Sequence, residues 1–438
     1  MVPSALARPF AGLRYARTDL SDVLAPPYDV IGPDELRRLY DRDPHNVARL
    51  ELSYTGPAES GGEARYAQAA RTLDAWRSRG VLTYDDGPCL YPHAHEFSLY
   101  GQRLTRVGVL CAVRLTPFEG GMVLPHEGTL RGPRKDRRLL MLACQAQISP
   151  VLALHQDPRG EVAQAIAEMM TEPPQAHAEV GDERHRLWRR PGDGVVEHYC
   201  ALVGQGPLFI ADGHHRYETA LGVSRELQAA HPDAAPEAAF NHVLALLCPV
   251  QQPGVVILPT HRLLRLRSAQ EWDHLERLLK EYFTCAPVAC DATDPFAAAR
   301  SLVKSLEEPN RGERFGMYTR SGGCALLSIR PEHLPAEPGP GGHNELATVL
   351  IHRLLIDPLV GAERLAERVD YVTDEAEAVQ RVTEGRADCA LFLRPTTVAQ
   401  MQRVALAGLR MPGKSTYFYP KAPTGLVISD ISPARTVE

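Results

Sequence analysis

The pattern of hydrophobic and polar residues alternates between two periods along the chain. Short apolar runs that are typical of buried strands occur at residues 150–155, 208–210, 243–250, 255–262 and 389–393. Apolar positions at helical spacing predict helices at residues 63–80, 160–170, 271–283 and 398–409. Strands that are interspersed with helices in this way predict an α/β fold of the mixed α+β kind.

The N-terminal part of the chain adds two strand predictions of a different kind. Residues 90–99 and 105–115 predict two strands that are joined by a short turn, which is the pattern of a hairpin. Residues 46–52 alternate polar and apolar side chains, so they predict a strand with Arg49 and Glu51 on the same face.

Residues 124–138 contain glycines and prolines and predict a loop, which leads into a helix at residues 138–147. The loop carries His126, Glu127, Thr129 and five basic residues up to the start of the helix. Arginine can bind phosphate oxygens in a bidentate geometry, so this loop is a candidate to hold a phosphorylated ligand. A solvated basic turn is the alternative.

A chain of 438 residues is too long for one ordinary hydrophobic core, so several domains are expected. Residues 331–342 are dense in proline and glycine and are typical of a linker. The expected division is an N-terminal α/β domain at residues 1–200, a central region at 201–330 and a C-terminal α/β region at 343–438.

The composition excludes several classes of protein. A net charge of −6 speaks against a nucleic-acid partner, because such a surface needs clustered excess positive charge. No apolar run approaches 18 residues, and the first residues do not resemble a secretory signal, so no membrane partner is expected. These features predict a cytoplasmic protein.

The thiols and imidazoles give little support for a metal site. The nine cysteines never form a C-x-x-C pair, which suits reduced thiols better than disulfides or a zinc cage. His93 and His95 lie on the same face of a predicted strand, but no third ligand stands near them in the sequence. No metal cage made by protein side chains alone is therefore expected.

The most distinctive chemistry follows the apolar run Leu208-Phe209-Ile210. There the sequence Asp212-Gly213-His214-His215-Arg216 opens an amphipathic stretch, so a strand, a tight turn and a helix are predicted. The first turn of a helix directs backbone N–H groups at an anion, and glycine allows a phosphate to approach the backbone closely. This stretch is therefore the first candidate site.

Each polar residue of the turn suits phosphoryl transfer. Gly213 and Arg216 are candidates to bind the phosphate, and His214 or His215 are candidates to donate or relay a proton. Asp212 is a candidate to accept the proton of a hydroxyl substrate, or to hold Mg²⁺ through one carboxylate. The alternative is that Asp212 only caps the helix.

Other residues stand where ligand sites often form. Tyr28 and Asp29 follow two prolines on a rigid corner, which suits either a structural turn or the lining of a site. His261 and Arg262 stand at the end of a predicted strand, where ligands gather in α/β proteins.

Residues 408–415 match the pattern G-x-x-x-x-G-K-S of a phosphate-binding loop. Such a loop needs a strand before it and a helix after it, whereas the residues before Gly408 predict a helix and those after Ser415 predict a strand. The match is therefore not interpreted as a P-loop. The residues that remain candidates to line a site as ordinary polar side chains are Lys414, Ser415, Tyr417 and Lys421.

Six motifs in order along the chain resemble the uncharacterised domain-of-unknown-function family 1015. They are Arg8-Pro-Phe10, residues 25–31, Leu124-Pro-His-Glu127, residues 211–220, Leu258-Pro-Thr-His-Arg262 and residues 411–421. At Gly413 that family more usually carries glutamine, which further weakens the P-loop interpretation.

A second resemblance covers only the Asp212–Arg216 motif, which is similar to the ParB/sulfiredoxin superfamily and within it to the free serine kinases. This resemblance implies a ParB/sulfiredoxin-like strand–turn–helix unit inside a larger chain, with nucleotide phosphates held at the turn. It implies a phosphotransferase that uses ATP or ADP with Mg²⁺ and acts on a small hydroxylated metabolite, with serine as the best guess.

Two other functions stay open for the same turn. One is hydrolysis of a phosphomonoester such as phosphoserine, and the other is a nucleotide-binding regulatory module without catalysis. In each case the expected partners are a nucleotide or another small molecule, and assembly with further copies of the chain is allowed by the sequence.

Overall fold

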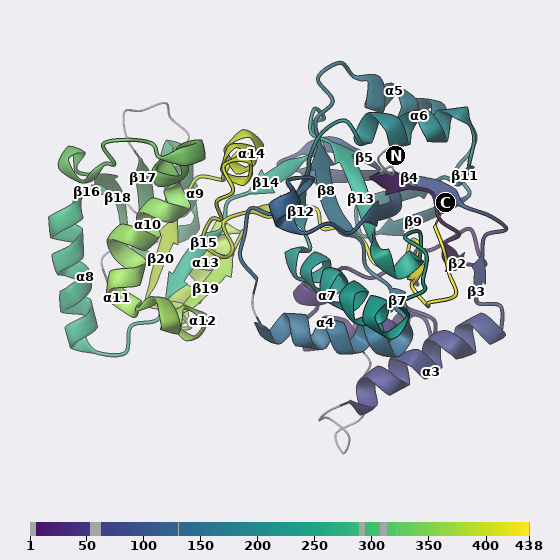
Figure 1. Cartoon of the computed structure of the whole chain (residues 1–438). Helices are drawn as coiled ribbons and strands as arrows, with labels where there is room; N and C mark the ends of the chain where they lie inside the picture. Colours follow the sequence, from purple (N-terminus) through teal and green to yellow (C-terminus); the bar gives the residue numbers. More distant parts are fainter. Residues whose placement is uncertain are drawn as a thin grey trace. The chain divides into compact units, whose positions relative to one another are not determined.

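The computed structural model describes residues 6–52, 63–129, 131–288, 294–306, 313–321 and 323–437 (Figure 1). The chain forms two compact units. The first contains Met1–Pro125, Thr129–Val256 and Pro420–Glu438, and the second contains His126–Gly128 and Ile257–Tyr419. The mixed α/β class expected from the hydrophobic pattern is confirmed, because each unit combines a sheet with helices.

The boundaries of these units can be compared with the expected three-part division. Residue 200 lies inside helix α6 (Gly194–Val203) of the first unit, and residues 331–342 lie inside the second unit. The chain leaves the first unit at Val256 and returns to it at Pro420. None of the helices in the described ranges has the length and apolar character that a membrane crossing needs.

The first unit is built on a ten-stranded sheet. Its strands are β1 (Ala7–Arg8), β4 (Cys89–Leu99), β5 (Gln102–Arg114), β6 (Val123–Leu124), β8 (Val151–His155), β9 (Ala176–Val180), β10 (Glu183–Leu187), β11 (Arg190–Pro191), β12 (Leu208–Asp212) and β13 (His242–Pro249). The order is β6-β12-β8-β13-β5-β4-β10-β9, with β1 beside β5 and β11 beside β4. β12 runs parallel to β6 and antiparallel to β8.

The other elements of the first unit are shorter strands and seven helices in the described part of the chain. The strands form two small ladders, β2 (Leu13–Tyr15) with β3 (Leu82–Tyr84) and β7 (Ala146–Gln147) with β22 (Ser429–Asp430). The helices are α1 (Pro33–Arg42), α2 (Ala48–Glu51), α3 (Ala64–Ser78), α4 (Arg131–Cys144), α5 (Glu161–Met169), α6 and α7 (His214–Ala230). In Figure 1, α5 lies beside α6 and α4 lies beside α7.

The core of the first unit lies against one face of the central strand. β13 is buried along its whole length, as expected for an apolar run between two neighbouring strands. Its alternate residues Val243, Ala245 and Leu247 pack with side chains from the helices, among them Val196 and Tyr199 of α6 and Tyr217 and Ala220 of α7. This packing fixes α7, and therefore the turn that precedes it, against the sheet.

The second unit is built on a six-stranded antiparallel sheet of order β16-β18-β17-β20-β15-β19. These strands are β15 (His261–Leu264), β16 (Phe283–Val288), β17 (Arg314–Thr319), β18 (Gly323–Ile329), β19 (Val369–Val372) and β20 (Cys389–Phe392). A separate ladder joins β14 (Val256–Leu258) to β21 (Tyr417–Tyr419). The helices are α8 (Ala269–Tyr282), α9 (Pro295–Leu306), α10 (Ala347–Ile351), α11 (Asp357–Val360), α12 (Leu365–Arg368), α13 (Glu375–Thr383) and α14 (Val398–Leu406).

Alternation along β15 and β20 shows that helices cover both faces of this sheet. Leu264 and Leu391 pack in a core with α8, α10 and α11, whereas Leu263 and Phe392 pack in a core with α9 and α13. Successive side chains of a strand point to opposite faces, so the two cores lie on opposite sides of the sheet.

Two expectations about the N-terminal part were wrong. Residues 46–52 do not form a strand, because Ala48–Glu51 is the short helix α2 and Glu51 is buried while Arg49 stacks on Tyr40. Helix α4 begins at Arg131 rather than at residue 138, so the basic residues of the expected loop belong to a helix.

Candidate functional site

The predicted strand, turn and helix are present as β12, Gly213 and α7. Gly213 adopts the left-handed region with φ of +92°, and a Cβ atom at this position would lie 3.0 Å from Nε of Arg216. Both the backbone angle and this close approach require glycine here. The turn therefore depends on Gly213 for its shape.

The carboxylate of Asp212 does not cap α7. Gly213 is the N-cap residue, and no side chain accepts a hydrogen bond at this helix start. Instead, Oδ2 of Asp212 accepts a hydrogen bond from Nη2 of Arg216 at 2.6 Å, and Oδ1 accepts one from Nζ of Lys421. The interpretation of Asp212 as a simple helix cap is thus wrong, since the carboxylate is the centre of a buried group of charges.

The charges around Asp212 determine its ionisation. Burial by itself would raise the pKa of this carboxyl, but the positive charges of Lys421 and Arg216 outweigh burial and hold the pKa well below its ordinary value. His214 acts in the same direction. Asp212 is therefore ionised at neutral pH.

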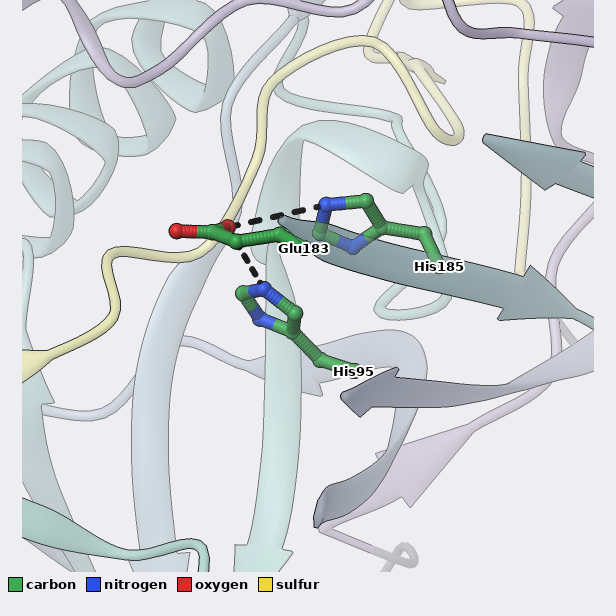
Figure 2. A group of neighbouring side chains, drawn as sticks. All are labelled: His95, Glu183 and His185. Atoms are coloured by element: carbon green, nitrogen blue, oxygen red, sulfur yellow. Dashed lines mark hydrogen bonds and ion pairs between the residues drawn. The ribbon is translucent and has the colours of Figure 1, made fainter. Parts of the chain in front are cut away.

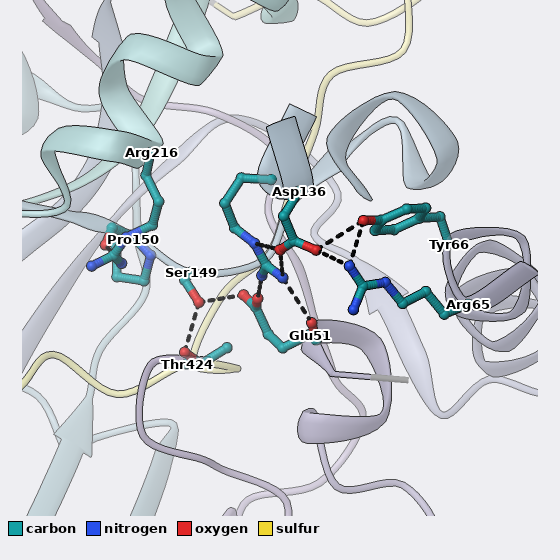
Figure 3. Close-up of polar contacts among 9 residues, drawn as sticks. Glu51, Arg65, Tyr66, Asp136, Ser149, Pro150, Arg216 and Thr424 are labelled. Atoms are coloured by element: carbon teal, nitrogen blue, oxygen red, sulfur yellow. Dashed lines mark hydrogen bonds and ion pairs between the residues drawn. The ribbon is translucent and has the colours of Figure 1, made fainter. Parts of the chain in front are cut away.

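Arg216 orders the turn through protein acceptors. Besides Asp212, it donates from Nη1 to the main-chain oxygen of Pro150, as Figure 3 shows for these two residues. The side chain also lines a cavity of about 30 Å³ together with Glu51, Arg137 and Ser149. The bidentate grip on phosphate expected for Arg216 stays a prediction, and in this conformation two of its nitrogens already bind the protein.

The two histidines of the motif differ in exposure. His214 is 7% exposed, whereas His215 is only half-buried. Neighbouring helical residues point in directions about 100° apart, so the two imidazoles cannot face the same point. His215 is thus the one that solvent or a ligand reaches more easily.

Lys421, which the sequence offered only as one of several polar residues that could line a site, is the second cation beside Asp212. It lies 209 residues from Asp212 in the chain, in the segment that returns to the first unit after the second unit is complete. Its side chain is 12% exposed, so the Asp212–Lys421 pair is almost closed to solvent.

A buried polar network borders Arg216 on the side of the small cavity. Glu51 forms an ion pair with Arg137, whose Nη2 also donates to the main-chain oxygen of Glu51 at 3.2 Å. Ser149 links Glu51 to Thr424, as seen in Figure 3. Tyr28 joins the network because its ring lies 3.9 Å from the guanidinium carbon of Arg137.

Tyr28 and Asp29, the corner residues expected to line a site, lie in different surroundings. Tyr28 begins the 3₁₀ turn η1 (Tyr28–Val30), and burial raises its pKa to about 12 even though Arg137 and Arg216 act in the opposite direction. Asp29 is exposed to solvent. The structure therefore places Tyr28, but not the Asp29 side chain, in the network beside Arg216.

Three basic residues of the predicted phosphate-binding loop, Arg134, Arg137 and Arg138, form ion pairs with acidic side chains. Arg134 pairs with Glu218 of α7 at 3.0 Å, and Thr129 also donates to Glu218. Arg138 pairs with Glu226, again on α7, at 2.6 Å. These contacts join α4 to α7, so the arginines support the helix that follows the Gly213 turn.

The remaining candidates, His126, Glu127, His261, Arg262 and Lys414, belong to the second unit. Glu127 accepts a hydrogen bond from the main-chain N–H of Lys414 at 2.7 Å, and Arg262 donates to the main-chain oxygen of Lys414 at 3.3 Å. His126 contacts the hydroxyl of Thr416 at 2.8 Å. The structure thus groups His126, Glu127 and Arg262 around the segment at residues 411–416, which contains Lys414.

Three of these residues, His126, His261 and Arg262, are fully buried. Burial lowers the pKa of Arg262 to about 10, although Tyr371 and Glu127 partly offset the effect. Burial also lowers the pKa of His261 to about 3, and its Nδ1 accepts a hydrogen bond from the main-chain N–H of Leu393. His261 is therefore neutral, and it packs against Phe392 as a core residue.

The structure confirms that residues 408–415 are not a P-loop. Helix α14 precedes Gly408 and strand β21 follows Ser415, which is the reverse of the strand and helix that a P-loop needs. Lys414 has a positive φ of +60° and is exposed.

Comparison with known proteins gives solved structures and a family. A free serine kinase variant in complex with AMP has a TM-score of 0.38 and 13% identity, over 73% of this chain and 92% of that one. A conserved hypothetical protein from Pyrococcus furiosus has a TM-score of 0.36 and 12% identity, over 73% and 94%. SbnI with a C-terminal truncation, from Staphylococcus aureus, has a TM-score of 0.35 and 9% identity, over 72% and 87%.

No curated protein matches the chain. The family model described as "Protein of unknown function (DUF1015)" matches residues 7–381, which is most of the chain. The chain belongs to the DUF1015 family.

Proposed function

We propose that this chain transfers a phosphoryl group between a nucleotide and a small hydroxylated metabolite at the Gly213 turn. The observation that carries the proposal is the buried carboxylate of Asp212, which is paired with Lys421 and Arg216 directly before the first turn of α7. Phosphoryl transfer requires mainly the positioning of reactants and positive charge around the transferring oxygens. The turn offers both.

The positive charge comes from Lys421 and from the helix. An ammonium group has three donors, so Lys421 can hold Asp212 and a phosphate oxygen at the same time. The N-terminus of α7 adds the positive end of the helix dipole, and Gly213 leaves no side chain between the backbone and a phosphate.

Asp212 and His215 have different roles toward the hydroxyl group of the metabolite. A carboxylate with a strongly lowered pKa is a weak base at neutral pH. Asp212 therefore orients the hydroxyl group of the metabolite by a hydrogen bond and does not act as the general base. An imidazole changes its protonation near neutral pH, and His215 is the more exposed of the two in the motif. We assign the proton relay to His215 and a supporting charge to His214.

The donor set does not fit a resident Mg²⁺ ion. Magnesium needs carboxylate oxygens that are available, and each carboxylate oxygen of Asp212 already accepts a hydrogen bond from a cation. We propose that Mg²⁺ enters only as part of its complex with ATP or ADP, as a component of the substrate.

The acceptor is the least constrained part of the proposal. Serine is the first compound to test, because the Asp212–Arg216 motif resembles that of the free serine kinases. The negative net charge supports a small-molecule partner rather than nucleic acid. A cytoplasmic location and assembly into homo-oligomers belong to the same proposal.

The test uses the purified full chain with ATP or ADP, Mg²⁺ and serine. Phosphoserine is followed by mass spectrometry, and nucleotide binding is followed by calorimetry. Asp212→Asn is expected to lower turnover by a factor of about 100 to 10,000, the range typical of a lost acid–base or positioning group. His215→Ala is expected to lower turnover while nucleotide affinity changes little.

Asp193→Asn is the matched control. Asp193 caps α6 in the same unit, and asparagine caps as well as aspartate does, so this variant should keep wild-type turnover. Failure of the wild-type chain to bind any nucleotide would refute the proposal. Release of inorganic phosphate from phosphoserine without nucleotide would favour the hydrolase, and tight nucleotide binding without turnover would favour the regulatory module.

A further inference from the structure

Three side chains that can ligate a metal meet on the sheet of the first unit, and none of them belongs to the Asp212–Arg216 motif. They are His95 on β4 and Glu183 and His185 on β10, and Figure 2 shows them converging. His95 pairs directly with His185 across the two strands, and Glu183 lies two residues before His185 on the same face. The partners that His93 and His95 lacked in the sequence are therefore supplied by a strand 88 residues further along.

The spacing of the ligand atoms suits a small divalent ion. Nε2 of His95 lies 2.7 Å from Oε2 of Glu183, and Nε2 of His185 lies 3.8 Å from the same oxygen. All three ligand atoms lie within 4.8 Å of one another. Ligand atoms held about 2.0–2.1 Å from a tetrahedral Zn²⁺ ion lie roughly 3.3 Å apart, so small side-chain movements close the site.

The surroundings of His185 match those of a metal-bound imidazole. Such a histidine usually donates its second ring N–H to a neighbouring acceptor, which fixes the orientation of the ring. Nδ1 of His185 lies 3.2 Å from Nε2 of His93, which can accept that hydrogen bond. His93 and His185 are buried, while the side chain of Glu183 is 27% exposed and gives an ion a route from solvent.

Arg106 opposes metal binding at His95. It donates from Nη2 to Nδ1 of His95 at 3.2 Å, so Nε2 of His95 carries the proton and donates it to Glu183. A metal on Nε2 requires the other neutral tautomer, with the proton on Nδ1, and Arg106 must then release that nitrogen. Arg106 keeps its second bond, from Nη1 to the main-chain oxygen of Pro420 at 2.6 Å.

We infer that His95, Glu183 and His185 form a binding site for a divalent ion of the Zn²⁺ type, with water as the fourth ligand. Two imidazoles and one carboxylate are a set of ligands that zinc takes in proteins when one position stays open. The ion would join β4 to β10. Arg106 would set its affinity by competing for His95.

The experiment uses the untagged full chain, stripped with a chelator and titrated with Zn²⁺ in a calorimeter. Co²⁺ is the second probe, because its absorption spectrum reports on the ligands. We expect one Zn²⁺ per chain, and an affinity that falls at least about tenfold in Glu183→Gln and in His185→Gln. Zn²⁺ should also raise the melting temperature of the wild-type chain, since only the folded state holds the site together.

Two further variants make the test specific. His177→Gln changes an exposed histidine on the neighbouring strand β9, and it should leave Zn²⁺ affinity unchanged. Arg106→Gln provides an amide oxygen that can accept from Nδ1 of His95, and it should tighten Zn²⁺ binding about tenfold. Equal affinity in the wild-type chain and in both ligand variants, or no binding by the folded wild-type chain, would overturn the inference.

Discussion

Arg106 donates a hydrogen bond at 2.6 Å to the main-chain oxygen of Pro420, and this bond connects two parts of the chain that are 314 residues apart. The residue after Pro420 is Lys421, the cation that holds Asp212. A guanidinium on β5 thus fixes the segment that delivers the lysine to the candidate site. Arg106 is a positioning residue, because the structure shows it acting through Pro420.

Replacement of Arg106 by leucine should loosen this segment. The change leaves the Pro420 oxygen and Nδ1 of His95 without their donor in a buried setting, so we expect the free energy of unfolding to fall by about 2 kcal/mol or more. Urea unfolding of the full chain measures the effect. Arg103→Leu, an exposed position on the same strand, should change stability by less than about 0.5 kcal/mol.

Two glycines of the same region should respond in opposite ways to alanine. Gly213→Ala forces a side chain into the left-handed region and against Arg216, and should destabilise the protein by about 1–2 kcal/mol. Gly222 lies in the middle of α7 with open space around it, so Gly222→Ala should stabilise by about 0.5–1 kcal/mol. Thermal melting of both variants compares them directly, and a stabilised Gly213→Ala would contradict the turn geometry.

Two ion pairs of α4 should contribute very different amounts to the free energy of unfolding. The side chains of Glu51 and Arg137 are 4% and 6% exposed, so Glu51→Gln removes the more buried of the two carboxylates that pair with this guanidinium, the other being that of Asp136, and it should cost about 3 kcal/mol. Glu226 and Arg138 are 42% and 43% exposed, and Glu226→Gln should cost no more than about 1 kcal/mol. Denaturant titration distinguishes the two, and similar losses would show that the buried network around Glu51 is not as closed as described.

Stability should fall between neutral and mildly acidic pH. Burial lowers the pKa of both His155 and His242 from 6.5 to about 4. Above pH 6.5 these imidazoles are neutral in the folded and unfolded states alike, so their contribution is complete. As the pH falls from 6.5 toward 4, only the unfolded chain takes up the protons, and the folded state loses stability.

A gap of about 2.5 pH units corresponds to a loss of ~3 kcal/mol for each histidine at most. Urea unfolding at pH 7.5 and pH 5 measures the change. His242→Gln removes one titrating group while keeping a donor for the Ala238 oxygen, so its stability should depend less on pH. The exposed residue His177 is the control, and His177→Gln should keep the wild-type dependence.

The parts of the fold that could be predicted are those determined by near neighbours in the chain. The strand and helix around Gly213 and the hairpin of β4 and β5 follow from local periodicity and turn residues. The fate of residues 46–52 did not follow, since α2 is only four residues long and its place depends on the contacts of Glu51 with Arg137 and Ser149. Local alternation cannot reveal such contacts.

In the candidate site, too, the local motif could be predicted from the sequence, whereas contacts between residues far apart in the chain could not. The Asp212–Arg216 motif could be located from the sequence, and Lys421 could be named as one of several polar candidates to line a site, whereas the pairing of Lys421 with Asp212 could not be predicted. Lys421 lies far along the chain, and the buried neighbours of Arg216 come from Pro150 and the Glu51 network. The sequence also suggested that arginines of α4 bind phosphate, but each of Arg134, Arg137 and Arg138 has an acidic partner that only the fold brings close.

The return of the chain to the first unit at Pro420 has a consequence for biosynthesis. A ribosome makes β12 and α7 long before it makes Lys421, because residues 257–419 must be translated in between. During that interval Asp212 can pair with Arg216 but not with Lys421, and Ser149 lacks its hydrogen bond with Thr424. Nascent chains stalled before residue 420 should therefore be more sensitive to protease around the Gly213 turn than the released protein.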